Sequence, residues 1–395
     1  MFYAILNIGT ALAINLPMLI VFSFLIGVAG SVALNNVAGT IADLFGDSDV
    51  AGQPMALFVA SANFGPSLGS PIGEWIVDNP HLSWRWIYYI NIIIGGAYAL
   101  VMCFMPETLP RIVIAREVKK RGSVNVDKRD IDIALGSDNL NVINEIKFVT
   151  TMALKIMVTE PIVIFLALYN GFAYGLLFLY LDGVFDVFVV NNGLSYIGAD
   201  LTYLNFCVGK FADSSCFAQA LTIAGVAITF CFIPVQTWLY RHDKARRGGQ
   251  GRPEARFLSS LVAVWGFPAS LFWFAFTSDG SVSYWSPVVA GGLLGFSDPL
   301  LWLSMLNYIT DSSPNVAASA IAAFLIPSFL IAAGLAHAGV RMFEVMSTTW
   351  AFATLAFISL GIVALVYILF FFGARLRRMS KLAVSDGGRR SSLVQ

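Results

Sequence analysis

Charged side chains are scarce in this sequence. Of its 395 residues, 12% are charged, about half the share in an ordinary soluble domain, whereas 57% are hydrophobic and the mean hydropathy is +0.75. Most soluble classes are excluded, because most of such a surface must face something other than water. The 24 Lys and Arg are balanced by 24 Asp and Glu, so the basic excess of a nucleic-acid-binding protein is missing. We therefore expect a membrane protein whose partner is the lipid bilayer and not nucleic acid.

Cysteine and histidine are also rare. The four cysteines lie in apolar surroundings, without the paired spacing of a zinc site or a disulfide framework: Cys103, Cys207, Cys216 and Cys231. The three histidines form no cluster. Because no nucleotide-binding glycine loop, metal cluster or nucleophile constellation is visible either, we expect no metal, no cofactor, no catalytic residues and no enzymatic activity.

Long hydrophobic runs dominate the remainder. A bilayer core needs about 20 apolar residues in a helix, and ten stretches approach or exceed this length. The first is too short and the sixth too long for one span. They cover residues 2–13, 17–41, 54–77, 84–105, 161–181, 201–240, 257–276, 284–306, 316–338 and 348–372. These runs predict an all-α polytopic membrane protein with about ten transmembrane helices.

Positive charge is confined to three hydrophilic segments. Residues 106–160, 241–256 and 373–395 hold 21 of the 24 Lys and Arg. Each segment follows an even-numbered stretch, so all three share one face, which the positive-inside rule assigns to the cytoplasm. We expect a cytoplasmic linker over 106–160 with one surface helix near 142–154, and a basic cytoplasmic tail over 373–395.

A glycine-proline run marks the third stretch. Gly65, Gly69 and Gly73 recur every four residues, which clears one helix face for close backbone approach. Pro66 and Pro71 would bend the same helix. A kinked helix with a small-residue face suits a moving interface, although tight structural packing explains the pattern as well.

Several further motifs occur in order along nearly the whole chain: Asn35–Phe45, Met55–Phe58, Trp84–Trp86, Pro106–Pro110, Arg252–Phe257 and Asp298–Trp302. Together with the Gly65-Pro66 helix they resemble the major facilitator superfamily and, more narrowly, its fungal twelve-span drug:proton antiporter branch of multidrug, polyamine and metabolite exporters. The Gly65-Pro66 helix is similar to the antiporter signature of that branch's fifth span.

The resemblance implies two helix bundles that alternate access to a central site. It makes residues 1–105 a four-span remnant of the N-terminal bundle and 161–372 a six-span C-terminal bundle. The first stretch then corresponds to the family's third span, so the chain is expected to be N-terminally truncated. Ser23 stands where the branch usually has arginine, and Ala51 precedes Gly52 where Arg-Gly is common.

The sixth stretch, 201–240, is 40 residues long, roughly 60 Å as a helix. Lys210 and Asp213 within it would each cost a few kcal/mol in the bilayer interior. Removing residues 210–225 leaves one ordinary span. We therefore hypothesise that 210–225 is a retained intron, which sequencing of the transcript would test.

Polar and aromatic residues within the spans are the candidates for a substrate cavity, because transporters of this kind bind near the midplane between bundles. Interhelical hydrogen bonding or core packing is the alternative for each of them. The candidates are Asn63, Asn91, Asn170, Tyr174, Gln236, Trp302 and Asn307.

Asp298 is the most informative ionisable residue. A carboxylate inside a span suggests function, with proton coupling the first candidate. Alternatively, Asp298 followed by Pro299 is the signature of a helix that restarts after a break at Gly295. Asp311, at the cytoplasmic end of the same stretch, is interpreted as a cap or a latch partner.

We expect a monomeric, multi-pass plasma-membrane transporter that exports a small amphipathic organic compound in exchange for protons. The substrate's identity is not encoded, since multidrug cavities are generic apolar surfaces. The alternative is a non-functional or regulatory membrane remnant of a truncated or misannotated transporter gene.

Overall fold

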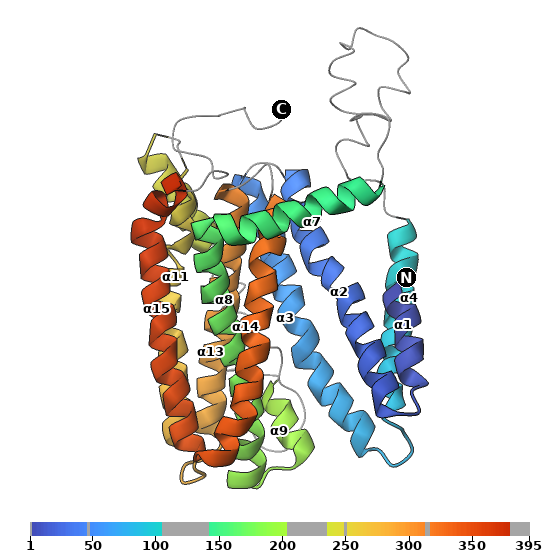
Figure 1. Ribbon diagram of the computed structural model, residues 1–395. Helices are drawn as coiled ribbons and strands as arrows, with labels where there is room; N and C mark the ends of the chain where they lie inside the picture. Colours follow the sequence, from blue (N-terminus) through green and yellow to red (C-terminus); the bar gives the residue numbers. More distant parts are fainter. Residues whose placement is uncertain are drawn as a thin grey trace. The chain divides into compact units, whose positions relative to one another are not determined.

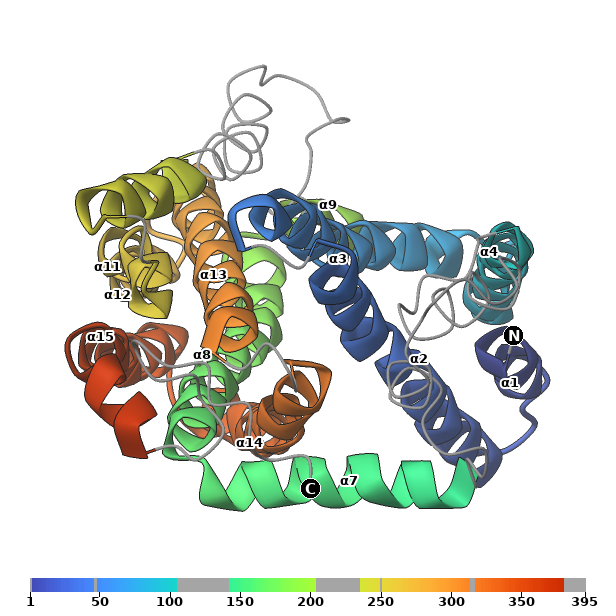
Figure 2. The same cartoon turned by 90° about the horizontal axis from the view of Figure 1, so that it is seen from above.

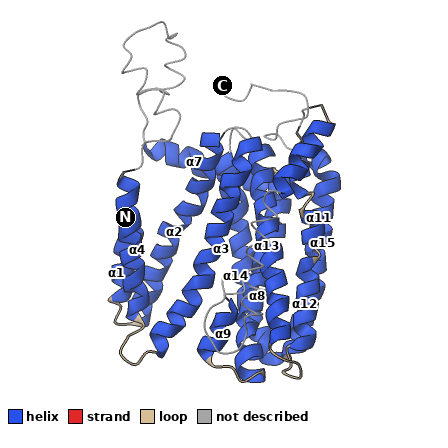
Figure 3. Ribbon diagram, turned by 180° about the vertical axis from the view of Figure 1, so that it is seen from behind, coloured by secondary structure: helices blue, strands red, loops and turns tan. Residues whose placement is uncertain are grey.

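The computed structural model describes residues 2–45, 48–104, 142–203, 235–248, 251–312 and 317–379, and the regular structure in these ranges is entirely helical (Figures 1 and 3). Contacts divide the chain into two compact units. The first comprises Met1–Gly46 with Trp75–Met152, and the second comprises Asp47–Glu74 with Ala153–Gln395.

In the first unit, α1 (Phe2–Ala11) packs against both α2 (Leu16–Phe45) and α4 (Arg85–Cys103). The side chain of Asn15 accepts a hydrogen bond from the backbone N–H of Met18 at 2.9 Å, which caps the start of α2. Arg85, at the start of α4, donates to the backbone carbonyl of Ala13 at 3.2 Å. These two contacts fix the turn between α1 and α2.

Two helices run across the division between the units. α3 (Ser48–Asp78) has 31 residues and carries the glycine-proline run as one continuous helix. α7 (Val142–Thr159) lies in the linker that follows the fourth predicted span. The helix expected near 142–154 is therefore confirmed, and it continues by five residues.

The second unit begins with α8 (Pro161–Phe185), which continues as a π-helical turn, η1 (Asp186–Asn191). Pro161 occupies the first helical turn, where its missing N–H is not needed. The elements that follow are α9 (Tyr196–Tyr203), a helix over 235–246, the 3-10 turn η3 (Pro253–Phe257), α11 (Ser260–Ala263), α12 (Gly266–Thr277), α13 (Trp285–Ser312), α14 (Ala317–Val345) and α15 (Thr348–Met379).

Within this unit α8 packs mainly along α14, and α12 packs against α13 and α15 (Figure 2). An aromatic group fills the space between α8, η1, α12 and α15. Phe274 lies 4.6 Å from Phe352, 4.8 Å from Tyr180 and 6.1 Å from Phe188, as measured between ring centroids, in edge-to-face arrangements. All four rings are buried, so this group is a core of the second unit.

Six described helices are long and apolar enough to cross a membrane: Arg85–Cys103, Pro161–Asn191, Ser260–Thr277, Trp285–Ser312, Ser319–Val345 and Thr348–Arg377. Shorter apolar helices cover Phe2–Ala11 and Leu16–Ser31. Nine of the ten predicted stretches coincide with described helices. The sixth stretch lies largely outside the described residues, as do the hypothesised intron 210–225 and most of the linker and tail.

Two local expectations differ from the structure. α13 continues through Pro299 without a new N-terminus, so the alternative that Asp298 caps a restarting helix is wrong. Pro299 only removes the N–H that would bond the carbonyl of Gly295. The span predicted to end at residue 181 continues in helical form to Asn191, because a helix need not end where the hydrophobic run does.

Candidate functional site

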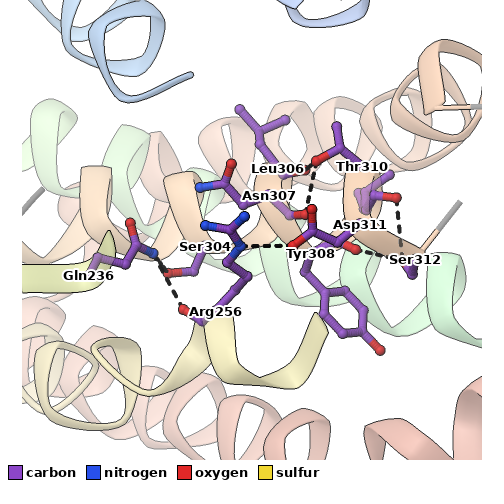
Figure 4. A network of polar contacts seen from close by, with 10 residues as sticks. Gln236, Arg256, Ser304, Leu306, Asn307, Tyr308, Thr310, Asp311 and Ser312 are labelled. Atoms are coloured by element: carbon purple, nitrogen blue, oxygen red, sulfur yellow. Dashed lines mark hydrogen bonds and ion pairs between the residues drawn. The ribbon is translucent and has the colours of Figure 1, made fainter. Parts of the chain in front are cut away.

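A buried ion pair joins η3 to the end of α13. Nε of Arg256 donates to Oδ2 of Asp311 at 2.8 Å, and the side chains are only 2% and 9% exposed (Figure 4). The Arg256 guanidinium also lies 3.8 Å from the ring centroid of Tyr240, a cation–π contact. Asp311 is thus an ion-pair partner within the second unit, and its interpretation as a cap or a latch partner stays a prediction.

A hydroxyl chain continues from this pair. Nε2 of Gln236 donates to Oγ of Ser304 at 2.8 Å and to the backbone carbonyl of Arg256 at 3.3 Å. Oγ of Ser260 donates to Oγ of Ser304 at 2.6 Å, and Ser304 donates to the carbonyl of Leu300 at 2.9 Å. Gln236 is therefore hydrogen-bonded inside the second unit, and its predicted cavity role stays a prediction.

A second buried ion pair joins η3 to α15. Arg377 donates through Nε and Nη2 to the two carboxylate oxygens of Glu254, at 2.7 and 2.8 Å. Both side chains are buried: that of Arg377 is 5% exposed and that of Glu254 is 3% exposed. This two-pronged geometry is the strong form of an arginine–carboxylate contact. Arg377 falls in the segment predicted as a tail, but α15 extends through Met379.

Asp298 lies elsewhere on α13 and has different surroundings. It is 7% exposed, and among the described residues no Lys, Arg or His forms an ion pair with it. Its charge acts on the phenols of Tyr169 and Tyr174, both on α8. Tyr169 is fully buried, and its hydroxyl has no hydrogen-bond partner within the described part of the chain.

Further aromatic rings contact Tyr174 and Trp302. The ring of Tyr174 lies edge-on to Phe178 and Phe329, with centroids 5.2 and 5.4 Å away. Trp302 follows Asp298 by one helical turn, so it shares the same face of α13, and its ring is 6.1 Å from that of Phe58 on α3. We call Asp298, Tyr169, Tyr174, Trp302 and Phe58 the Asp298 cluster.

Of the predicted residues, Tyr174 therefore lies near Asp298, and Trp302 lies one helical turn from Asp298 on α13. Asn170 is buried beside Tyr169 on α8. Tyr169 and Phe58 were missed by the sequence reasoning, because an aromatic residue within a span is normally interpreted as packing. The only available signal was that Tyr169 lies five residues before Tyr174, next to a candidate asparagine.

Two further predicted residues lie on α4 of the first unit and on α13 of the second. Asn91 donates to the carbonyl of Ile87 within α4 at 3.1 Å. Asn307 is buried on α13 with no described partner for its amide nitrogen, but it lies nine residues from Asp298 and thus on the opposite helix face.

In the antiporter-motif helix, a Cβ added at Gly65 or Gly69 would meet no described atom within 4 Å, and Gly73 is half-buried. The side chains of Asn63 and Pro66 lie outside the described set.

Comparison with known proteins agrees with this architecture. Residues 1–337 match the family model described as Major Facilitator Superfamily. The chain is 51% identical over 384 residues to "Uncharacterized transporter C965.13" of Schizosaccharomyces pombe, covering 97% of this chain and 67% of that protein.

Two further relatives carry more specific names. "Vitamin B6 transporter bsu1" of Schizosaccharomyces pombe is 40% identical, covering 96% of this chain and 68% of that protein. "Ascochitine biosynthesis cluster MFS transporter" of Didymella fabae is 27% identical, covering 96% and 70%. This all-helical, multi-pass chain therefore belongs to the major facilitator superfamily, a family of membrane transporters and not of enzymes.

Proposed function

We propose that this protein, a secondary transporter by family, exports a small amphipathic organic compound in exchange for protons. The observation that carries the proposal is Asp298, a carboxylate buried in a membrane-spanning helix without an ion-pair partner among the described residues. Ionisable residues in such positions are costly and usually serve transport. The motifs around Gly65 and Pro66 support the drug:proton antiporter branch.

Asp298 is the proposed proton-coupling residue. Asp298 lies close enough to Tyr169 and Tyr174, both on α8, for its charge to act on their phenols. Protonation would remove the buried negative charge, so the proton would favour whichever conformation excludes water from this residue. Such a difference between two states is what couples a ligand to a conformational change.

The two ion pairs of η3 supply a rigid cytoplasmic end to the second unit. Glu254 and Arg256 lie two residues apart and hold α15 and α13 respectively. We propose that these contacts let the helices of this unit move together when access alternates. The cytoplasmic side, the plasma membrane and the monomeric state belong to the same proposal and derive from the positive-inside pattern and the family resemblance.

The substrate path is proposed to run along the Asp298 cluster, with Asn170 beside it. Asn63, Asn91, Gln236 and Asn307 remain further candidates from the sequence. The glycine-proline helix, with Gly65, Pro66, Gly69 and Gly73, is proposed as a moving surface.

Transport by Asp298→Asn tests the proposal. We would express the chain in a yeast strain sensitive to a panel of toxic metabolites and measure intracellular accumulation at several external pH values. The expected result is that the wild-type chain lowers accumulation in a pH-dependent way and that Asp298→Asn abolishes this dependence. Asp279→Asn is the matched control, because Asp279 is an exposed carboxylate whose pKa is lowered by hydrogen bonds from Ser281. No change in accumulation for any compound would refute export.

A second candidate function is transport of vitamin B6. The relative of that name is 40% identical over nearly the whole chain, which favours a related substrate. Uptake of radiolabelled vitamin B6 by cells that lack their own transporter would test it. Uptake equal to that of cells with an empty vector would exclude this candidate.

A further inference from the structure

We infer that the Asp298 cluster binds an organic cation, namely a protonated amine on an aromatic or other apolar body. The inference rests on the proposed function, since it names the class of substrate for the same site. It follows from three features of the cluster as the described residues show it: a carboxylate without an ion pair, a phenol hydroxyl without a hydrogen-bond partner, and a set of aromatic rings.

Among the described residues, the Asp298 carboxylate lacks the counter-charge that comparable buried carboxylates have. Glu254 and Asp311 are as buried as Asp298, and each binds an arginine of the same unit. Asp298 forms no ion pair within the described ranges. A buried ionised carboxylate is costly unless it is neutralised or paired. A cationic ligand would supply the missing charge.

The second feature is the phenol hydroxyl of Tyr169. It is fully buried, feels the charge of Asp298 and has no hydrogen-bond partner in the described structure. Buried polar groups normally have partners. An ammonium group has several N–H donors, so one ligand could donate to the carboxylate of Asp298 and to the phenol oxygen of Tyr169 at once.

The rings supply surfaces for the remainder of the ligand. Tyr174 is half-buried and is flanked by Phe178 and Phe329, and Trp302 is half-buried beside Phe58. Aromatic faces attract cations through their quadrupole, and they also accept apolar groups. A carboxylate with aromatic neighbours thus fits a cation on a hydrophobic body.

An anionic substrate does not fit these surroundings. It would meet the negative charge of Asp298, and the buried arginines of this unit, Arg256 and Arg377, are held by Asp311 and Glu254. A neutral substrate would supply no opposite charge, so the carboxylate would have to be neutralised by a proton instead. Charge therefore decides the substrate class.

Equilibrium binding to the full chain in lipid nanodiscs tests the inference. The probes are 1-naphthylmethylamine, which is protonated at neutral pH, and 1-naphthalenemethanol, which has the same rings and no charge. We expect the amine to bind at least about tenfold more tightly than the alcohol, because opposite charges attract strongly in a low-dielectric site. Asp298→Asn should remove that preference, and Asp298→Glu should retain part of it.

Two further variants separate the contribution of the Tyr169 hydroxyl from that of the Tyr174 ring. Tyr169→Phe removes only a hydroxyl without a described partner, so the protein should fold normally and bind the amine several-fold more weakly. Tyr174→Leu should weaken both probes and keep the preference for the amine. Asp279→Asn, in the exposed loop after α12, should bind both probes like the wild type.

The outcomes distinguish this inference from the proposed function, since binding is measured without any gradient. Binding that prefers the amine, with no export of it by cells, supports the inference and counts against the proposed function. Equal binding of the two probes, a preference for the alcohol, no binding of either, or an unchanged preference in a correctly folded Asp298→Asn would overturn the inference. Export of neutral compounds would then leave the proposed function standing.

Discussion

At the scale of single residues, the second unit contains two kinds of buried charged side chain: those with an ion-pair partner and one without a described partner. Arg256 with Asp311 and Glu254 with Arg377 are compensated pairs at hydrogen-bond distance, whereas Asp298 has no partner of opposite charge in the described residues. The compensated pairs are positioned by tertiary packing and hold helices together. Asp298, which has no such partner among the described residues, is the residue that we propose for proton coupling and ligand binding.

Removing one member of a buried ion pair should lower the free energy of unfolding. Arg256→Ala or Asp311→Asn leaves a charge buried without its partner, so we expect each variant to lose about 3–5 kcal/mol of unfolding free energy. The double variant Arg256→Met with Asp311→Leu should lose much less, because it removes both charges. Denaturant-induced unfolding of the purified protein in detergent, analysed as a double-mutant cycle, measures the difference.

The exposed pair Arg341–Glu344 provides the control for this prediction. It has a similar N–O distance of 2.8 Å, but the side chains are 82% and 53% exposed. Removing either charge should change stability by at most about 1 kcal/mol. Equal losses at the buried and the exposed pair would contradict the importance that we give to burial.

At the scale of helices, the contact between α8 and α14 depends on glycine. A Cβ added at Gly171 would lie only 2.9 Å from Cβ of Ile331, and Gly175 faces Leu335 in the same way. Close to Gly171, Oγ of Ser328 donates to the backbone carbonyl of Ala167 across the interface at 3.1 Å. Small residues allow helix backbones to approach closely in membranes, and here they bring α8 and α14 together.

Replacing one of these glycines should push the two helices apart. Gly171→Ala or Gly175→Ala is expected to cost about 1–3 kcal/mol through overpacking, visible as a lower thermal unfolding midpoint. Gly334→Ala on α14 is the matched control, because an added Cβ meets no described atom within 4 Å there. That variant should be neutral or gain about 0.5–1 kcal/mol from reduced chain entropy. A loss at Gly334 as large as at Gly171 would argue against the close approach.

Helix positions were largely predictable, but helix ends were not. The hydrophobic runs located α1 to α4, α8 and α12 to α15, since hydropathy is a local property of the chain. The extension of α8 through η1 to Asn191, past Asp182 and Asp186, was not foreseen. Helix ends depend on hydrogen bonds such as those from Asn191 to the carbonyl of Ser278 and to Oγ1 of Thr348, at 2.7 and 3.2 Å.

At the scale of the whole molecule, the charge distribution predicts one orientation in the membrane. Residue 281 lies in a short connection with no Lys or Arg, and residue 247 lies in a basic segment. In a cysteine-free background, Ser281→Cys should react with a membrane-impermeant maleimide on intact cells. Arg247→Cys should react only after permeabilisation, because positive segments remain in the cytoplasm. Labelling of both on intact cells would contradict the predicted orientation.

The predicted bundles 1–105 and 161–372 stay predictions, as do the linker 106–160 and the tail 373–395. In the structure, residues 47–74 are grouped with the second unit, and α15 extends into the predicted tail. The fold class itself is confirmed: the chain is an all-helical, polytopic member of the major facilitator superfamily.

Composition and hydropathy alone determined that this chain lies in a membrane and where most of its helices run, and the charge pattern predicted its orientation. Only the tertiary structure showed which buried carboxylates have partners. The residues that meet are 55 positions apart in Arg256–Asp311 and 123 apart in Glu254–Arg377. No local pattern encodes such pairings, because they depend on helices that pack together only after folding. The same packing leaves Asp298 with tyrosines around it and no described counter-charge, and that makes it the candidate site.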